Sequence, residues 1–198
     1  RQAKELSTTL GHALAKLEVE DIEARIQDTA HAIHSAGTID EILLELQQPI
    51  MQLFDSKLIT IYAVDEIRNE IYSKVKSGDQ INEIRVPISG TSISGSVALT
   101  KKPANISDVY NPEELKSFHP SLEFDSSWDK KTGLRTKSML VYPLLQGENL
   151  MGVMQLVNKN HGGRFSGFDE RNANNIAQTL ALAFFNQQKI NRQKRTKF

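Results

Sequence analysis

One polar side chain interrupts an apolar stretch near the C-terminal end of the chain. Residues 150–157 read LMGVMQLV, a run of β-branched and flexible apolar residues that predicts a strand buried on both faces. Gln155 lies in this run between Met154 and Leu156. A buried amide costs about 1–3 kcal/mol unless it is hydrogen-bonded. Gln155 therefore needs a partner, and the sequence leaves open whether that partner is protein or a bound ligand.

A second candidate for chemistry is the segment from Ser89 to Val97, which consists mostly of small and polar residues and precedes a predicted short helix ending near Leu99. Because the first amides of a helix have no partner inside the helix, this loop could hold an anion such as a phosphate. It lacks the G-K-[ST] of a Walker loop. An ordinary turn is the alternative.

Patterns typical of enzymes and metal sites are missing from the sequence. The five histidines are scattered, and although His31 and His34 share a helix face, no third ligand lies near them. There is no G-x-S-x-G or H-E-x-x-H motif. The sequence has no cysteine, which excludes disulfides, zinc–thiolate sites and thiol catalysis. We expect a binding domain and not an enzyme.

Length indicates one domain with long appendages, and the balanced charge indicates no general affinity for nucleic acid or membranes. The 198 residues suit one domain, and 24 basic against 24 acidic residues give no net charge that would attract nucleic acid or a membrane surface. No apolar run approaches 18 residues, so we expect no membrane insertion and a cytoplasmic location. The chain starts without Met and stops within a basic run, which suggests a piece of a longer protein.

Helices and strands must position these residues. The sequence predicts helices at 1–35, 39–54 and 166–197, and strands at 57–64, 70–75, 83–86, 104–107, 138–145 and 150–157. Pro49 should kink the second helix or free the carbonyl of Glu45. Ser166 with Asp169 forms a capping box at the start of the last helix.

The first helix carries an apolar stripe at Leu6, Leu10, Ala13 and Leu17. Exposed leucines need cover, and a second copy of the same helix would supply it in a dimer. Folding back on its own domain is the alternative.

The first strand alternates between two kinds of face. Ile59, Ile61 and Ala63 form an apolar face that should meet helices, whereas Thr60 and Tyr62 carry hydroxyls that could line a cavity. A stretch of about 30 residues without a sizeable element follows later, from Asp108 to Lys137, with helical turns expected at 112–118 and 124–131. Long loops in compact domains are often functional. Its aromatic residues suggest a lid, or simple packing on the open face of the sheet; they are Phe118, Phe124 and Trp128.

A family resemblance appears at Asn158, Lys159, Phe165, Asp169 and Glu170, which are spaced like the N-K-x(n)-F-x3-D-E signature of GAF domains in cyclic-nucleotide phosphodiesterases and cyclases. Upstream, WDKKTGLRTKSMLVYPL from Trp128 to Leu144 resembles the D-x-x-T-G-x-R-T run of the same subfamily. The resemblance covers about residues 37–186.

The resemblance implies a fold and a domain plan. The fold is α+β and GAF/PAS-like: a six-stranded, mainly antiparallel sheet has helices on one face, a lidded pocket on the other, and long N- and C-terminal helices. Residues 1–36 would form a signalling and dimerisation helix, 37–186 the GAF domain, and 187–198 an extension toward an effector domain. Covalent bilin attachment and Cys-dependent methionine sulfoxide reduction, two special uses of this fold, are excluded by the lack of cysteine.

The resemblance also implies ligand contacts. Ile93 and Ser94 match the backbone pair that cradles a cyclic phosphate, and Gln155 stands where some nucleotide-binding members have Glu. Lys159 and Asp169 would pair across the rim of the pocket and hold the site together without touching the nucleotide; a helix cap beside a solvated lysine is the alternative. The other positions carried over are Thr60, which would touch the base, and the lid residues Trp128, Asp129, Thr132 and Thr136.

Two departures weaken the match. Lys76-Ser77 stands where a binding member has Phe-Asp, the stacking ring and the base-reading acid, and Trp128 or Tyr62 would have to stack instead. The loop from Gly90 to Ile93 is also one residue longer than usual.

Two functions follow as expectations. The first is a regulatory sensor that binds a small ligand, a cyclic nucleotide such as cAMP or cGMP, and signals as a homodimer through its terminal helices to an effector domain. The second is a GAF module without a nucleotide site, serving dimerisation or docking in a larger signalling protein or a secretion or pilus ATPase.

Overall fold

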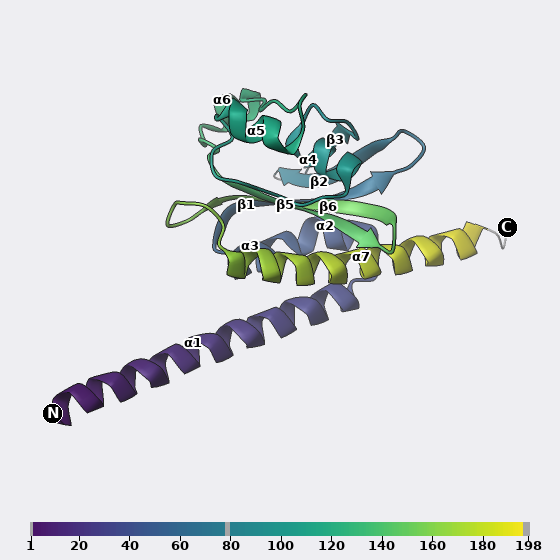
Figure 1. Ribbon diagram of the computed structural model, residues 1–198. Coiled ribbons are helices and arrows are strands. Elements are labelled where there is room, and N and C mark those ends of the chain that lie inside the picture. The colour runs from purple at the N-terminus through teal and green to yellow at the C-terminus, as the bar shows by residue number, and fades with distance from the viewer. Residues whose placement is uncertain (1, 78–79, 196–198) are drawn as a thin grey trace.

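The computed structural model describes residues 2–77 and 80–195 and contains one six-stranded sheet (Figure 1). The strands lie in the order β3-β2-β1-β6-β5-β4, and each neighbouring pair is antiparallel. The strands are β1 (Ser56–Asp65), β2 (Glu70–Ser77), β3 (Gln80–Pro87), β4 (Ala104–Ile106), β5 (Met139–Gln146) and β6 (Asn149–Lys159). The helices are α1 (Gln2–Ser35), α2 (Ile39–Glu45), α3 (Gln47–Leu53), α4 (Ile93–Thr100), α5 (Pro112–Phe118), α6 (Ser127–Thr132) and α7 (Gly167–Arg195).

Helices cover both faces of the sheet. Helices α2, α3 and α7 lie on one face together with the end of α1, and the segment containing α4, α5 and α6 lies on the other (Figure 1). The predicted α+β fold with an antiparallel six-stranded sheet is therefore confirmed. The face expected to be lidded carries three short helices.

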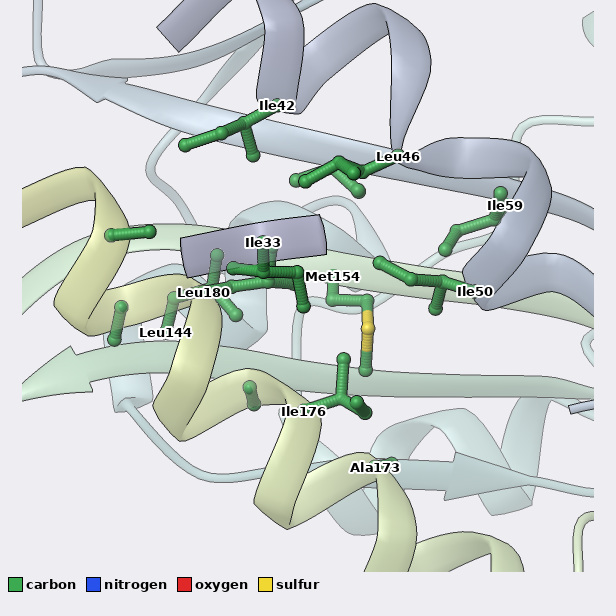
Figure 2. Packing of buried hydrophobic residues seen from close by; sticks show 14 of the residues in the cluster. Ile33, Ile42, Leu46, Ile50, Ile59, Leu144, Met154, Ala173, Ile176 and Leu180 are labelled. Atoms are coloured by element: carbon green, nitrogen blue, oxygen red, sulfur yellow. The ribbon is translucent and has the colours of Figure 1, made fainter. Parts of the chain in front are cut away.

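The larger apolar cluster lies between the sheet and the long helices. Ile59, Ile61 and Ala63 of β1 belong to it, as the alternation in the sequence predicts. Figure 2 shows Ile176 and Leu180 of α7 with the side chains of α2, α3 and the end of α1, all gathered around Met154 of β6. The burial of these side chains stabilises the face on which the chain begins and ends.

The predicted helix 39–54 is two helices. α2 ends at Glu45 and α3 begins at Gln47, with Leu46 between them as a cap. Pro49 has no amide hydrogen, so the carbonyl of Glu45 cannot receive its usual bond from that position. The break expected from Pro49 is therefore found, one turn before the proline.

α1 leaves the body of the protein. Its last turns pack on the domain through Ile33, which is fully buried, and its N-terminal end projects away (Figure 1). Leu10, Leu14 and Leu17 are more than half exposed. The alternative that this helix folds back on its own domain does not describe its first half. The side chain of Leu6 and all of Arg1 lie outside the described residues.

A second apolar cluster fills the opposite face. Val109, Leu115 and Leu122, all from the stretch predicted to be a lid, are buried in it with Val97 of α4. The long stretch from Asp108 to Lys137 contains α5 and α6 where the sequence predicts helical turns, and the segment that holds these short helices packs on the sheet.

Candidate functional site

Gln155 has a protein partner. Its carbonyl oxygen Oε1 accepts a hydrogen bond from the hydroxyl of Ser94, at the start of α4. The sheet register places Gln155 directly opposite Thr60 of β1. The structure thus answers the question that the strand pattern leaves open, because the partly buried amide is paired with a hydroxyl 61 residues away in the sequence.

Tyr62 completes a polar cluster around this pair. Its side chain is 6% exposed, and its hydroxyl hydrogen-bonds with Ser94 and Thr60. Burial raises the pKa of Tyr62 to about 12, more than these hydrogen bonds lower it. The phenol therefore stays neutral at physiological pH. Thr60, Tyr62, Ser94 and Gln155 form a cluster of uncharged donors and acceptors on an otherwise apolar face.

The N-terminus of α4 borders this cluster. Ser92 is its N-cap, with its hydroxyl accepting from the amide of Gly95 at 3.2 Å. A Cβ on Gly95 would lie 2.5 Å from the carbonyl oxygen of Pro87, so glycine is required for this close approach. The amides of Ile93 and Ser94 belong to the first turn, whose donors have no acceptor within the helix. Together they form the element that could receive an anion.

The segment from Asp108 to Lys137 is docked over this face. Asn111 caps α5 through its side chain, and the carboxylate of Glu114 accepts from the amides of Ser107 and Asp108 at 2.7 and 3.1 Å. The ring of His119 lies against Gly90, where an added Cβ would be 2.0 Å from a ring atom. These contacts fix residues 108–137 against the face of the sheet that carries α4.

Asp129 and Thr136 meet each other within the lid. The Asp129 carboxylate accepts from the Thr136 amide at 2.8 Å, from the Thr136 hydroxyl at 2.6 Å and from the Tyr110 hydroxyl at 2.8 Å. The Arg135 guanidinium lies 4.4 Å from the centre of the Tyr110 ring. Burial acts to raise the pKa of Asp129, but the hydrogen bonds from Thr136 and Tyr110 outweigh it and hold that pKa below its ordinary value.

The other predicted contacts are more scattered. Trp128 is 53% exposed, with the Lys131 ammonium 5.4 Å from its ring centre. Lys74, two residues before Lys76 on β2, forms a 2.7 Å ion pair with Asp40 of α2, so alternation places the exposed Lys76 on the face of α2 and not on the face of Ser94.

Two of the predicted contacts fall on side chains outside the described part of the chain. Ser77 ends β2 and Thr132 ends α6. Their backbones belong to those elements, and the roles that the resemblance implies for their side chains stay predictions.

Asn158 fastens the end of the lid to the sheet. It is 7% exposed and has a positive φ of 54°. Its Oδ1 accepts from the amides of Lys137 and Ser138 at 2.7 and 3.1 Å, and its Nδ2 donates to the carbonyl of Arg135 at 2.9 Å. One side chain thus satisfies three backbone groups where the lid enters β5.

Lys159 fastens the helices on the other side. Its ammonium donates to the Phe54 carbonyl at 2.9 Å and pairs with Asp169 at 3.0 Å. Asp169 in turn accepts from the amide and hydroxyl of Ser166, and the Ser166 hydroxyl accepts from the Asp169 amide, which confirms the predicted capping box. This pair lies beside Phe54 and Phe165 of the larger apolar cluster, away from Gln155.

Phe165 and Glu170, which also carry the resemblance noted in the sequence, join elements as well. Phe165 is 2% exposed in the larger cluster. Glu170 of α7 accepts from the side-chain amide of Asn105 on β4 at 2.9 Å, and the same amide donates to the Phe165 carbonyl at 3.0 Å. The structure therefore brings together three groups of predicted residues: Thr60, Ser94 and Gln155; Asp129 and Thr136; and Lys159, Phe165 and Asp169.

Sequence analysis missed Tyr110 and Ser73. Tyr110 gives no signal, because an exposed tyrosine in a loop is ordinary. Ser73 does give one, since it is a small polar residue between Ile71 and Val75 on one face of a strand, as Gln155 is on β6. Among residues 2–77 and 80–195, no group of three or more His, Asp or Glu side chains is placed to hold a metal ion, and no helix is long and apolar enough to cross a membrane.

Comparison with known proteins assigns the fold to a family. The family model for the GAF domain matches residues 38–184. The chain is 31% identical over 156 residues to the probable 3',5'-cyclic phosphodiesterase pde-5 of Caenorhabditis elegans, covering 72% of this chain and 20% of that protein. It is 34% identical over 117 residues to the dual 3',5'-cyclic-AMP and -GMP phosphodiesterase 11 of Drosophila melanogaster, covering 59% of this chain and 7% of that protein. The chain thus spans a small part of these relatives.

Solved structures agree on the fold. The GAF domain of a phosphoenolpyruvate-protein phosphotransferase from Coxiella burnetii superposes with a TM-score of 0.68 at 14% identity, covering 86% of this chain and 96% of that one. The free methionine-R-sulfoxide reductase of Neisseria meningitidis, in complex with its substrate, superposes with a TM-score of 0.63 at 17% identity, covering 85% and 91%. At such identities the likeness concerns the fold.

Proposed function

This chain belongs to the GAF domain family, is homologous to domains of cyclic-nucleotide phosphodiesterases, and from that premise we propose that it is a regulatory domain that senses a cyclic nucleotide. The observation that carries the proposal is the polar cluster of Thr60, Tyr62, Ser94 and Gln155, built into an apolar face at the N-terminus of α4 and covered by a docked lid. The domain itself would catalyse no reaction.

Each part of the cluster suits one part of such a ligand. The first-turn amides of α4, at Ile93 and Ser94, would receive the cyclic phosphate. The uncharged groups of Thr60 and Gln155 would hydrogen-bond the base. A side-chain amide carries both a donor and an acceptor, so Gln155 can form hydrogen bonds with the edge of adenine or with that of guanine. Both cAMP and cGMP are therefore candidate ligands.

The structure is in a closed, self-paired arrangement. Ser94 and Gln155 are bonded to each other, and Asp129 is bonded to Thr136 and Tyr110 within the lid. We propose that ligand entry exchanges these internal bonds for bonds to the nucleotide. A ligand that binds one arrangement better than the other shifts the population toward it.

Two adjacent residues of β6 would carry the shift to the terminal helices. Asn158 holds the end of the lid, and Lys159 holds the start of α7 and the end of α3. A movement of the lid is therefore transmitted through one peptide unit to the helix that leads toward the C-terminus. We propose that residues 1–36 and 187–198 connect this signal to an effector domain.

A second candidate function is a dimerisation or docking module. It is favoured by the exposed leucines of α1 and by the fact that Lys76 lies on the face opposite Ser94. In this account the polar cluster is a permanent part of the core, and the terminal helices carry the function.

Calorimetric titration with cAMP and then cGMP separates the two candidates. The sensor account predicts micromolar or tighter binding that Gln155→Leu weakens at least about tenfold, because one hydrogen bond in a desolvated site contributes on the order of 1.4 kcal/mol. Asn160→Ala is the matched control, since this exposed amide contacts Asp55 and lies outside the cluster. Flat titrations with both nucleotides, from a folded domain, would favour the docking module.

A further inference from the structure

A fully buried hydroxyl on β2 is left without a partner. The side chain of Ser73 is 0% exposed, and its Oγ makes no hydrogen bond among the residues that the structure describes. Leaving such a group unsatisfied costs about 1–3 kcal/mol. A polar group of this kind in a native protein points to a partner that arrives from elsewhere.

The sheet register places Ser73 beside the polar cluster. β1 and β2 pair Ala63 with Tyr72 and Val64 with Ile71, and Tyr62 and Ser73 are the residues that directly adjoin the first of these pairs on each strand. Ile71 belongs to the second apolar cluster, and alternate residues of a strand share a face. Ser73 therefore faces the α4 side of the sheet, as Tyr62 and Gln155 do.

We propose that the ligand site extends from Gln155 across β1 to β2, and that Ser73 is a further ligand-contacting residue that hydrogen-bonds the part of the ligand remote from Ser94. This inference rests on the proposed function. β6 and β2 are separated by β1, so the two ends of the site lie two strand spacings apart, about 10 Å. A flat heterocyclic ligand held at α4 spans that width.

The chemistry of the site defines what Ser73 would meet. Ser73, Tyr62, Thr60, Ser94 and Gln155 are all uncharged, so the floor of the site suits the neutral polar edge of a heteroaromatic ring. A serine hydroxyl can donate or accept. Ser73 would thus require a hydrogen-bonding atom at that place in the ligand without choosing between a donor and an acceptor.

A hydroxyl reserved for a ligand has an unusual signature on substitution. Ser73→Ala removes a group that has no partner in the unliganded protein, so its stability should stay the same or rise. The same change removes a bond to the ligand, so the dissociation constant should rise about tenfold. A structural hydroxyl gives the reverse pattern.

Ser56→Ala is the matched control. Ser56 is also a buried serine of the sheet, but its hydroxyl donates to the Met51 carbonyl of α3 at 3.4 Å, away from the polar cluster. This variant should lose stability and keep the affinity of the wild type.

The experiment combines urea unfolding of the unliganded chain with calorimetric titration by cAMP and cGMP, for the wild type and both variants. The proposal expects Ser73→Ala to unfold at the same or a higher urea concentration than the wild type and to bind about tenfold more weakly. Wild-type affinity in Ser73→Ala would overturn this inference alone, as would a loss of stability equal to that of Ser56→Ala. A wild type that binds neither nucleotide would overturn the proposed function together with it.

Discussion

At the scale of single residues, Asn158 and Lys159 show why two neighbours on one strand can serve opposite sides of a sheet. Asn158 adopts a left-handed φ of 54°, which Asn tolerates better than most residues, and this breaks the regular alternation of the strand. Asn158 then bonds the backbone at the end of the lid, and Lys159 turns to Phe54 and Asp169. The neighbouring Asn158 and Lys159 therefore join lid, strand and helices.

The Lys159–Asp169 pair should contribute to stability well beyond an exposed ion pair. Asp169 is 6% exposed and caps α7 as well as pairing with Lys159. Asp169→Ala should lower the free energy of unfolding by about 3 kcal/mol, because it removes the cap and leaves a partly buried ammonium unpaired. Urea unfolding at pH 7 measures this. Asp169→Asn keeps a side-chain acceptor for Ser166 and should cost less; a loss under about 1 kcal/mol in Asp169→Ala would mean a surface pair.

Asn158→Ala should be still more disruptive locally. It leaves the amides of Lys137 and Ser138 without their side-chain acceptor and places alanine at a positive φ. We expect a loss of about 3 kcal/mol or more in unfolding free energy, and faster amide exchange at residues 135–138. Asn158→Gly, which relieves the backbone but lacks the amide, separates the two causes. Unchanged exchange at residues 135–138 in both variants would contradict this role.

At the scale of elements, the sequence predicts the long helices, the strands and two helical turns in the lid, but not how those turns pack on the sheet. Strong periodicity marks α7 and β6, whereas α5 and α6 have 7 and 6 residues, too few for a periodic pattern to emerge. β3 begins at Gln80, three residues before its predicted start, and its first four residues are exposed, so no buried apolar face marks this end in the sequence. The placement of α5, α6 and the start of β3 is therefore determined by contacts with the rest of the domain and not by a local sequence pattern.

The candidate site could be predicted only in part for a related reason. The strand pattern shows that Gln155 needs a partner, but Ser94 comes from a helix 61 residues away, and only the fold brings the two together. The face of the sheet on which the Lys76 side chain lies depends on the register of β2, because a shift of one residue moves a side chain to the other face. Local sequence patterns do not predict which residues from distant parts of the chain come into contact in the folded domain.

The lid should loosen in acid through Asp129. Its pKa in the folded protein lies below the ordinary value of about 3.9. The stabilisation that Asp129 gives is therefore complete above about pH 4 and is lost as the pH falls through the lower, folded pKa. Trp128, the only tryptophan, lies in α6 beside Asp129 and reports on this segment.

Trp128 fluorescence followed from pH 6 to pH 3 should change below about pH 4, before far-ultraviolet circular dichroism shows loss of helix. In Asp129→Asn the amide cannot titrate, so the lid signal should already resemble the acid form at pH 6. A fluorescence transition that coincides with global unfolding, in both proteins, would show that Asp129 does not hold the lid.

At the scale of the whole molecule, the terminal helices present surfaces that the domain leaves uncovered. Leu10, Leu14 and Leu17 are 63%, 53% and 60% exposed on the projecting half of α1. The helices also differ in charge: α1 carries Glu20, Asp21 and Glu23, whereas α7 carries Lys189 and Arg192 toward its C-terminal end. Both features favour a homodimer formed through α1 and α7.

Replacing Leu10, Leu14 and Leu17 together by Lys should convert that dimer to a monomer. The apolar contact between copies would be lost, while the domain, whose core begins near Ile33, should keep its unfolding temperature. Sedimentation equilibrium with a thermal scan measures both. A wild type that sediments as a monomer, or a dimer that survives the triple change, would contradict dimerisation through these three leucines.

The central claim is that a cyclic nucleotide binds beneath the lid and that the effect of its binding is transmitted through β6 to the terminal helices. Hydrogen exchange of the whole chain, with and without saturating cAMP or cGMP, tests this most directly. We expect slower exchange at residues 92–98 and 108–137, together with a change at the start of α7. Identical exchange with and without both nucleotides, or protection limited to residues 10–35, would contradict a nucleotide site on the α4 face.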